Sequence, residues 1–128
     1  MTSITLAPIK NISGSVSLPG SKSLSNRALL LSSLASGKTK LTNLLRSDDI
    51  HHMVKALQQL DVRIDLSEDQ KRADIEGKGG LFAPPVNKHF FFGNAGTAIR
   101  PLTSVLALVD GEFEIDGDEY MRERPIEH

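Results

Sequence analysis

Residues 18–27 are Leu18-Pro19-Gly20-Ser21-Lys22-Ser23-Leu24-Ser25-Asn26-Arg27, and they join a predicted strand to a predicted helix. Upstream, residues 13–18 alternate small polar and apolar side chains and stop at Pro19-Gly20, a pair typical of a turn. Downstream, residues 25–34 are rich in leucine and alanine and are followed by Gly37, which predicts a buried helix. The sequence therefore predicts a strand, a glycine loop and a helix in direct succession.

Further elements follow in a regular order. Residues 39–45 are typical of a second strand, and Ser47 can cap a helix whose first turn holds Asp48-Asp49. The apolar side chains of this helix recur at helical spacing, at Ile50, Met53, Val54, Leu57 and Leu60. Residues 62–66 alternate apolar and charged side chains, and together with residues 73–76 they predict a hairpin.

The same order then begins again. Sliding the sequence by 73 positions places Gly93 on Gly20 and Arg100 on Arg27. One inserted residue later, Gly111 falls on Gly37 and Ile115 falls on Leu41. The shared order of strand, glycine loop, arginine-bearing helix, glycine and strand favours an internal duplication over coincidence. We therefore expect an α/β (α+β) chain made of repeated strand-helix-strand-helix-strand-strand units.

The repeat also predicts where the second unit continues. Its next helix corresponds to a region that opens at Arg124-Pro125, where proline suits the first helical position. A unit without this helix leaves apolar strands uncovered. We therefore expect the 128 residues to be a fragment that is marginally stable alone or needs a complementary piece.

Composition limits the classes of partner. Fifteen basic and sixteen acidic residues give a formal net charge of -1, so no overall positive field attracts nucleic acid or an acidic membrane. The absence of cysteine excludes disulfides, thiolate metal sites and a cysteine nucleophile in these residues. The sequence has neither a secretion signal nor an apolar run of about eighteen residues. We expect a soluble, cytoplasmic protein in which any anion site is built locally.

Residues 20–27 combine a helix start with hydroxyl groups and two cations. Free backbone N–H groups and the helix dipole favour an anion at such a position. Lys22 adds a compact charge, Ser23 a short donor, and Arg27 a planar fork that matches phosphate or carboxylate oxygens. The spacing is not that of a nucleotide-binding P-loop, because Ser21 separates Gly20 from Lys22. The alternative is a serine-rich helix cap with solvated cations.

Two further clusters lie in the second unit. Residues 93–100, Gly93-Asn94-Ala95-Gly96-Thr97-Ala98-Ile99-Arg100, form a glycine loop in which small side chains let a ligand approach the backbone. Alone, this loop could be a tight strand-to-helix turn, but two such loops in register favour a shared anion cleft. Arg124, in residues 121–125, can extend that cleft, although an exposed charge run fits equally well.

Other polar residues favour simpler roles. The histidines lack the spacing of a metal-ligand pair, which favours solvated or locally capped histidine over a metal site. Asp48-Asp49 is interpreted as first-turn helix stabilisation and not as a catalytic carboxylate pair.

Taken together, residues 18–31, 93–102 and 122–126 resemble the motifs of the 5-enolpyruvylshikimate-3-phosphate synthase family. The resemblance runs over essentially the whole chain, and proteins of this family are much longer. It implies the inside-out fold of enolpyruvyl transferases, in which two globes of βαβαββ units aim helix N-termini into a cleft. Residues 1–19 would be the leading strand region of the lower globe, and residues 20–128 a partial upper globe. In that globe the first unit would span about 20–80, and a truncated second unit about 86–128.

The resemblance implies a transferase that moves the enolpyruvyl group of phosphoenolpyruvate to the 5-hydroxyl of shikimate 3-phosphate and releases phosphate, on the route to chorismate and aromatic amino acids. Lys22 is implied to be the catalytic residue that contacts both substrates and stabilises charge on the departing phosphate. The other implied substrate-binding residues are Ser23 and Arg27 for shikimate 3-phosphate and Gly96 and Arg124 for phosphoenolpyruvate, with Asn94, Thr97 and Arg100 shaping the second pocket. No metal or organic cofactor is implied.

The resemblance also implies partners. Groups that move protons come largely from the other globe, so the remainder of the same polypeptide is expected to complete the site, and the isolated chain is expected to be inactive. Glyphosate, an inhibitor of the family, mimics phosphoenolpyruvate beside Gly96. Two alternatives stay open: an enolpyruvyl transferase that acts on a nucleotide sugar, and a non-catalytic anion-binding fragment.

Overall fold

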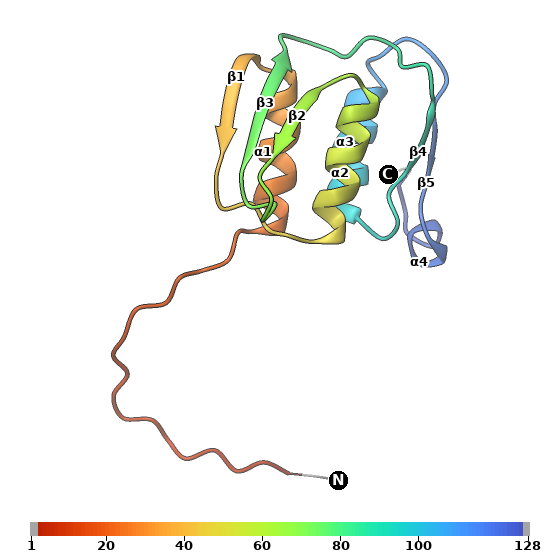
Figure 1. Ribbon diagram of the computed structural model, residues 1–128. Helices are drawn as coiled ribbons and strands as arrows, with labels where there is room; N and C mark the ends of the chain where they lie inside the picture. Colours follow the sequence, from red (N-terminus) through yellow and green to blue (C-terminus); the bar gives the residue numbers. More distant parts are fainter. Residues whose placement is uncertain (1–2, 127–128) are drawn as a thin grey trace.

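A computed structural model describes residues 3–126 of the chain, and Figure 1 shows their arrangement. Helices and strands alternate in a mixed α/β order, which confirms the predicted fold class. The first group of elements is α1 (Lys22–Leu34), β1 (Ser36–Leu41), α2 (Asp48–Gln59), β2 (Arg63–Leu66) and β3 (Ala73–Lys78). The second group is β4 (His89–Phe91), α3 (Gly96–Leu106), β5 (Glu114–Asp116) and α4 (Glu119–Arg122).

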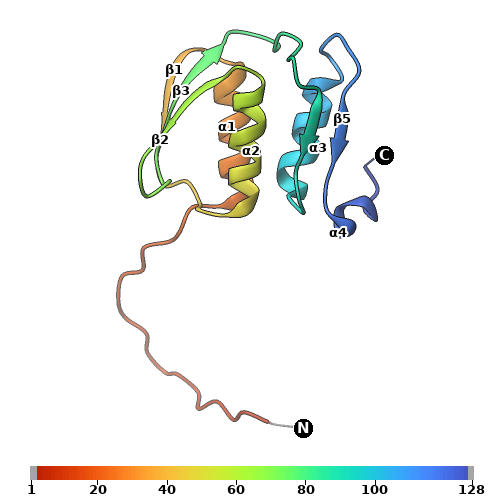
Figure 2. The same cartoon turned by 45° about the vertical axis from the view of Figure 1, so that its right-hand side comes forward.

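The strands form two separate sheets with the long helices between them. One sheet has the order β1-β3-β2 and is antiparallel throughout, whereas β4 and β5 pair in parallel. In Figure 2 the larger sheet lies on one side of α1 and α2, and β5, which pairs with β4, lies on the other side next to α3. Helices α1, α2 and α3 pack against one another, so the helices are internal and the sheets external.

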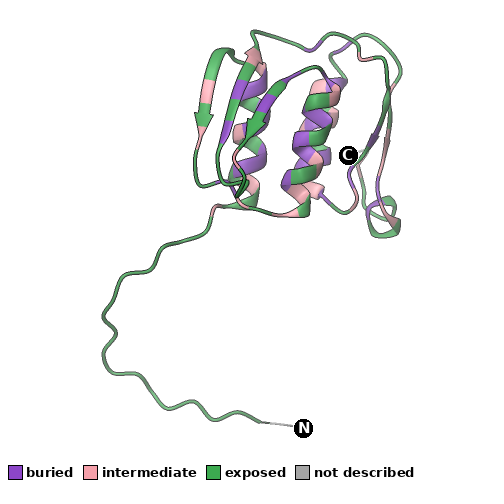
Figure 3. Cartoon of the chain, in the orientation of Figure 1, coloured by how far each residue is buried: buried purple, intermediate pink, exposed green. Residues whose placement is uncertain are grey.

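The apolar residues of the helices supply the core between the layers. The predicted stripe on α2 is buried from Ile50 to Leu57, and Leu60 at its C-cap is also buried. Leu29 of α1 and Leu102 of α3 are completely buried where the helices meet. Figure 3 shows buried segments on the facing sides of the helices, while the residues before α1 are exposed. Across the described residues, none of the helices is long and apolar enough to cross a membrane.

The helices run in the same direction. The N-terminal ends of α1, α2 and α3 all lie at the end of the molecule from which the N-terminal segment emerges in Figures 1 and 2. Because each helix carries a partial positive charge at its N-terminus, the three ends reinforce one another there. The fold therefore places its most favourable region for an anion at this end.

Several predicted elements form with shifted limits. Helix α1 begins at Lys22 and not at residue 25, because Ser21 accepts a hydrogen bond from the N–H of Leu24 and caps the helix. Strand β1 ends at Leu41, four residues before the predicted limit, and Asn43 then adopts a positive φ of 57°. The hairpin forms as predicted, with Ile64 opposite Ile75.

Two predicted elements do not form in the described residues. Residues 13–18 are exposed and make no strand, because no other described segment runs beside them to accept their backbone hydrogen bonds. The assignment of residues 1–19 to a second globe stays a prediction. The helix expected to open at Arg124-Pro125 has not begun by Ile126, and residues 127–128 lie outside the described residues. The chain instead makes the single turn α4 just before Arg124.

Candidate functional site

A polar hollow of about 400 Å³ lies where the helix N-termini meet. It draws side chains from the first turns of α1 and α2, from the loop before α3 and α3 itself, and from the segment after α4. The lining residues are Lys22, Asp49, Asn94, Gly96, Thr97, Arg100 and Arg124. Segments that are distant in sequence, in both units, thus share one site.

The close approach of two backbone segments fixes the start of α1. A Cβ atom on Gly20 would lie 2.0 Å from the carbonyl oxygen of Asn43 and 2.7 Å from the nitrogen of Leu45, so only glycine fits. One turn later, the hydroxyl of Ser25 accepts a hydrogen bond of 3.1 Å from the same Leu45 N–H. These contacts hold the loop before α2 against α1, and they place Lys22 near the first turn of α2.

The loop before α3 has a second glycine with a specific function. Gly93 has a φ of +53°, and a Cβ atom there would lie 2.7 Å from Nε2 of His52. The His52 ring also packs edge-on against Phe91, with the ring centroids 5.9 Å apart. Helix α3 then begins at Gly96, and its N-cap Ala95 makes no side-chain hydrogen bond. His52 of α2 therefore packs against the loop that leads into α3. Helix α3 lacks the side-chain N-cap that Ser21 gives α1 and Ser47 gives α2.

Three cations face the hollow, and Arg124 lies closest to the loop before α3. Its Nη1 atom is 2.8 Å from the position that a Cβ atom on Gly96 would occupy. Arg100 donates a hydrogen bond of 3.5 Å to the carbonyl oxygen of Pro125, which links α3 to the segment that carries Arg124. With Lys22 from the first turn of α1, the hollow is lined by three positive side chains and the single carboxylate of Asp49. This excess of positive charge suits a multiply charged anion.

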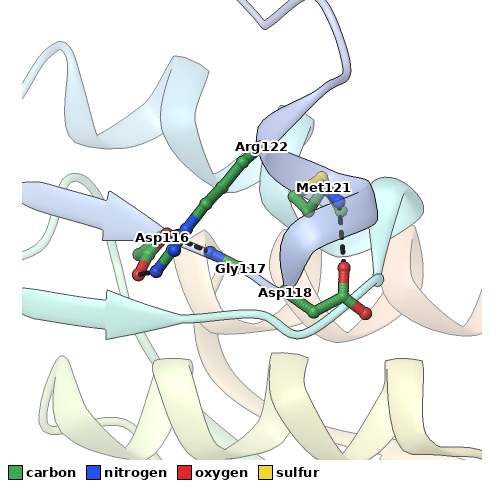
Figure 4. A network of polar contacts seen from close by, with 5 residues as sticks. All are labelled: Asp116, Gly117, Asp118, Met121 and Arg122. Carbon is green, nitrogen blue, oxygen red and sulfur yellow. Dashed lines mark hydrogen bonds and ion pairs between the residues drawn. The ribbon is translucent and has the colours of Figure 1, made fainter.

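Arg122 has a different function from Arg124, although both lie in the same charged run. Figure 4 shows the Arg122 guanidinium forming two parallel hydrogen bonds to Asp116, of 2.9 and 2.7 Å. The hydrogen bonds from Arg122 and from the Gly117 N–H lower the pKa of Asp116 from 3.8 to about 2. Asp118 caps α4 by accepting a hydrogen bond from the Met121 N–H. The paired Arg122 thus fixes the turn that presents Arg124 to the hollow.

Most of the predicted site residues meet at this hollow, but two do not line it. The structure brings together Lys22, Asn94, Gly96, Thr97, Arg100 and Arg124. Ser23 and Arg27 lie four residues apart on α1, on a neighbouring strip of the helix, with Ser23 half-buried and Arg27 exposed. Arg27 has no ion-pair or hydrogen-bond partner among residues 3–126. Their assignment to shikimate 3-phosphate therefore stays a prediction.

Sequence reasoning missed two residues of this region. Asp49 does lie in the first turn of α2, as predicted, but it also lines the hollow. A usable signal was present, since Asp49 precedes the buried Met53 by four residues and so lies on the inward side of the helix. His52 contacts Gly93, and the same signal applies to it, because His52 precedes the buried Ala56 by four residues whereas the exposed His51 precedes the exposed Lys55.

Comparison with known proteins connects this site to one family. The sequence profile described as EPSP synthase (3-phosphoshikimate 1-carboxyvinyltransferase) matches residues 6–128. The 3-phosphoshikimate 1-carboxyvinyltransferase of Aliivibrio fischeri (strain MJ11) is 56% identical over 128 residues, which are 100% of this chain and 30% of that protein. The protein of the same name from Haemophilus influenzae (strain PittGG) is 56% identical over 131 residues, again 100% of this chain and 30% of that protein.

A solved structure agrees with the sequence comparisons. The EPSP synthase from Acinetobacter baumannii superposes with a TM-score of 0.79 at 28% sequence identity, and the match covers 89% of this chain and 26% of that chain. The chain thus spans about 30% of the length of the curated relatives it matches. The motifs around Gly20 and Gly93, the internal helices and the profile match lead to one conclusion: the chain belongs to the EPSP synthase (3-phosphoshikimate 1-carboxyvinyltransferase) family.

Proposed function

We propose that this chain forms part of an enzyme that transfers the enolpyruvyl group of phosphoenolpyruvate to the 5-hydroxyl of shikimate 3-phosphate and releases phosphate. The observation that carries the proposal is the hollow at which Lys22, Arg100 and Arg124 surround the start of α3. Both substrates carry several negative charges, and this site concentrates cations in a chain whose formal net charge is -1.

The proposed roles follow from chemistry and position. Lys22 and Arg124 approach the hollow from opposite units, so a phosphate or carboxylate group between them can bond to both. Each charge-assisted hydrogen bond of this kind contributes about 1.5 to 3 kcal/mol. Gly96 leaves room for the anion beside Arg124, because the nearest atom to a Cβ there is the guanidinium itself. The compact ammonium of Lys22 is suited to stabilise charge on the departing phosphate.

The reaction also needs groups that protonate the enol carbon and remove the proton of the attacking hydroxyl. We expect these groups from the remainder of a polypeptide as long as the relatives, of which this chain spans about 30%. We therefore expect the chain by itself to bind the substrates weakly and to show no turnover. The two relatives described above are both named for the shikimate substrate, which favours this reaction over transfer to a nucleotide sugar.

The test is a fused enzyme in which these 128 residues replace the matching part of the Aliivibrio fischeri relative. We expect release of phosphate that requires both phosphoenolpyruvate and shikimate 3-phosphate. Lys22→Met should lower kcat by a factor of at least about one hundred, since a lost charge-assisted contact of about 3 kcal/mol corresponds to that factor. Lys40→Met, on the exposed face of β1, is the matched control and should keep the parent rate.

Three outcomes decide between the functions. Turnover with shikimate 3-phosphate and its loss in Lys22→Met support the proposal. Turnover with a nucleotide sugar in place of shikimate 3-phosphate contradicts it. Binding of phosphoenolpyruvate without turnover, in a fused enzyme whose far-ultraviolet circular dichroism matches that of the relative, supports a non-catalytic anion-binding fragment.

A further inference from the structure

Asp49 contacts side chains from both of the other helices at the hollow. Its Oδ2 atom lies 3.4 Å from Nζ of Lys22 on α1, and the same oxygen lies 3.4 Å from Oγ1 of Thr97 on α3. The Asp49 side chain is 19% exposed, compared with 48% for Lys22. The Asp49 carboxylate at the start of α2 therefore contacts the first turn of α1 and the first turn of α3, each of which follows a glycine loop.

A chain of hydrogen bonds continues from Thr97 into the core. The amide Nδ2 of Asn26 donates to Oγ1 of Thr97 at 2.8 Å, and Asn26 is completely buried. An ionised carboxylate only accepts hydrogen bonds and an ammonium only donates them. The direction of the hydrogen bonds is thus fixed: Asn26 donates to Thr97 and Thr97 donates to Asp49, while Lys22 forms an ion pair with Asp49.

Stabilisation of helix α2 alone does not explain why an aspartate lines the hollow at position 49. Asp48 occupies the same first turn, is exposed, and can complement the helix dipole without entering the site. Asp49 instead lines the hollow, where its negative charge opposes the binding of an anion. A carboxylate that weakens the local positive field needs another function, and the contacts with Lys22 and Thr97 supply one.

We infer that Asp49 is a positioning residue that holds the Lys22 ammonium and the Thr97 hydroxyl in place before the anion binds. This inference rests on the proposed function, because it assigns Asp49 to the same site. Holding Lys22 in advance limits the rotamers that its long side chain must lose when the substrate arrives. Its negative charge offsets this gain in affinity, because it opposes the anion, whereas the position of Lys22 still serves the reaction step. We therefore expect Asp49 to support the rate of the reaction more than the affinity for the anion.

The kinetic test uses Asp49→Asn in the fused enzyme, with Asp48→Asn as the matched control. Both variants remove one negative charge from the first turn of α2 and keep a similar side-chain size. We expect Asp49→Asn to lower kcat about tenfold, the order expected when a catalytic group is misplaced by part of an ångström. The KM for phosphoenolpyruvate should stay the same or fall, because the site becomes more positive. Asp48→Asn should match the parent in both constants.

Other kinetic outcomes overturn the inference. A lower KM with unchanged kcat in Asp49→Asn shows that the carboxylate acts only as a charge. Unchanged constants in both variants, with similar losses in melting temperature, show that it acts only on the helix.

A spectroscopic test is independent of turnover. In ¹H–¹⁵N spectra of the 128-residue chain, Asp49→Asn should shift the amide signals of residues 21–23 and 96–98 as well as those of α2. Asp48→Asn should shift signals only near the start of α2. Shifts confined to α2 in both variants contradict the inference. If the fused parent enzyme is inactive with both substrates, the proposed function fails, and these spectra still decide whether Asp49 joins the two loops.

Discussion

Gly20 has a structural function at the scale of a single residue. It allows the backbone before α1 to touch the loop at residues 43–45, and that contact helps to fix where Lys22 lies. We predict that Gly20→Ala lowers the free energy of unfolding by about 3 kcal/mol, because the methyl group meets backbone atoms that cannot turn aside. Gly37→Ala is the comparison, since it meets no atom within 4 Å and only strains a φ of +83°.

For Gly37→Ala we expect a loss of roughly 1 kcal/mol. Urea unfolding of the chain followed by circular dichroism measures both values. If both variants lose the same free energy of unfolding, the contact with residues 43–45 does not explain the glycine at position 20.

Gly96 lies beside Arg124 at the hollow. A methyl group there would lie 2.8 Å from Nη1 of Arg124, so the flexible guanidinium has to move. In the fused enzyme we predict that Gly96→Ala weakens inhibition by glyphosate at least about tenfold, and raises the KM of the shorter phosphoenolpyruvate by less. Inhibition constants measured against phosphoenolpyruvate provide the check. Equal inhibition of the variant and the parent contradicts this steric explanation.

Asp116 makes stability depend on pH in the acid range. Its pKa is about 2 in the folded chain, lowered first by the hydrogen bond from Arg122, against an ordinary value of 3.8. The unfolded chain therefore binds more protons between these values, and the contribution of Asp116 is complete above about pH 4 and lost as the pH falls through about 2.

We predict that Asp116→Asn reduces the dependence of stability on pH between pH 4 and pH 2. Urea midpoints measured across this range for the variant and the parent test the prediction. Some dependence should remain, because pairing with Lys78 also lowers the pKa of Asp61. Identical slopes in the variant and the parent would contradict the assignment of Asp116.

At the scale of elements, α2 supplies much of the contact between the layers. Leu57 is completely buried on its inner side, whereas Lys55 is exposed on the outer side. We predict that Leu57→Ala lowers the free energy of unfolding by about 3 kcal/mol, because it removes apolar contacts and leaves a cavity. Lys55→Ala is the control and should change stability by less than about 0.5 kcal/mol. Similar unfolding midpoints for both variants would contradict the observed orientation of α2.

The sequence predicted elements best where a periodic apolar pattern was long. The spacing of apolar residues on α2 and the alternation in the hairpin of β2 and β3 both led to elements that form. The first and last residues of helices and strands were predicted less well, because only a few residues determine where an element begins or ends. Ser21 is a single capping residue, and it starts α1 three residues before the apolar pattern does.

At the scale of the whole molecule, residues 3–18 pair with no strand among the described residues. They carry exposed apolar side chains along their length, among them Ile4, Leu6, Ile9, Ile12, Val16 and Leu18. Exposed apolar side chains that occur this often are typical of a surface that another polypeptide segment covers. The longer relatives have further polypeptide that could pair with this segment.

We predict that trypsin cleaves the isolated chain after Lys10 within minutes, because the exposed backbone there fits a protease without unfolding. In the fused enzyme the same bond should be protected at least about tenfold, as expected if the segment pairs with the added polypeptide. Mass spectrometry of the fragments follows both reactions. Equal cleavage rates at Lys10 would show that the segment stays exposed in the longer protein.

The sequence by itself determined the order of elements from α1 to β5, the α/β class, the family and most of the residues at the hollow. These properties depend on local periodicity, on turn residues such as Gly93, and on motifs that are contiguous along the chain. The tertiary structure alone decided which charged side chains meet. Asp49 and Asp48 are neighbours in sequence, as Arg124 and Arg122 nearly are, yet only Asp49 and Arg124 line the hollow. For the two aspartates the physical reason is that a helix turns about 100° per residue, so packing between helices selects Asp49 and leaves Asp48 in solvent. For the two arginines the reason is that Asp116 holds Arg122 in an ion pair, whereas Arg124 lies beyond the end of α4.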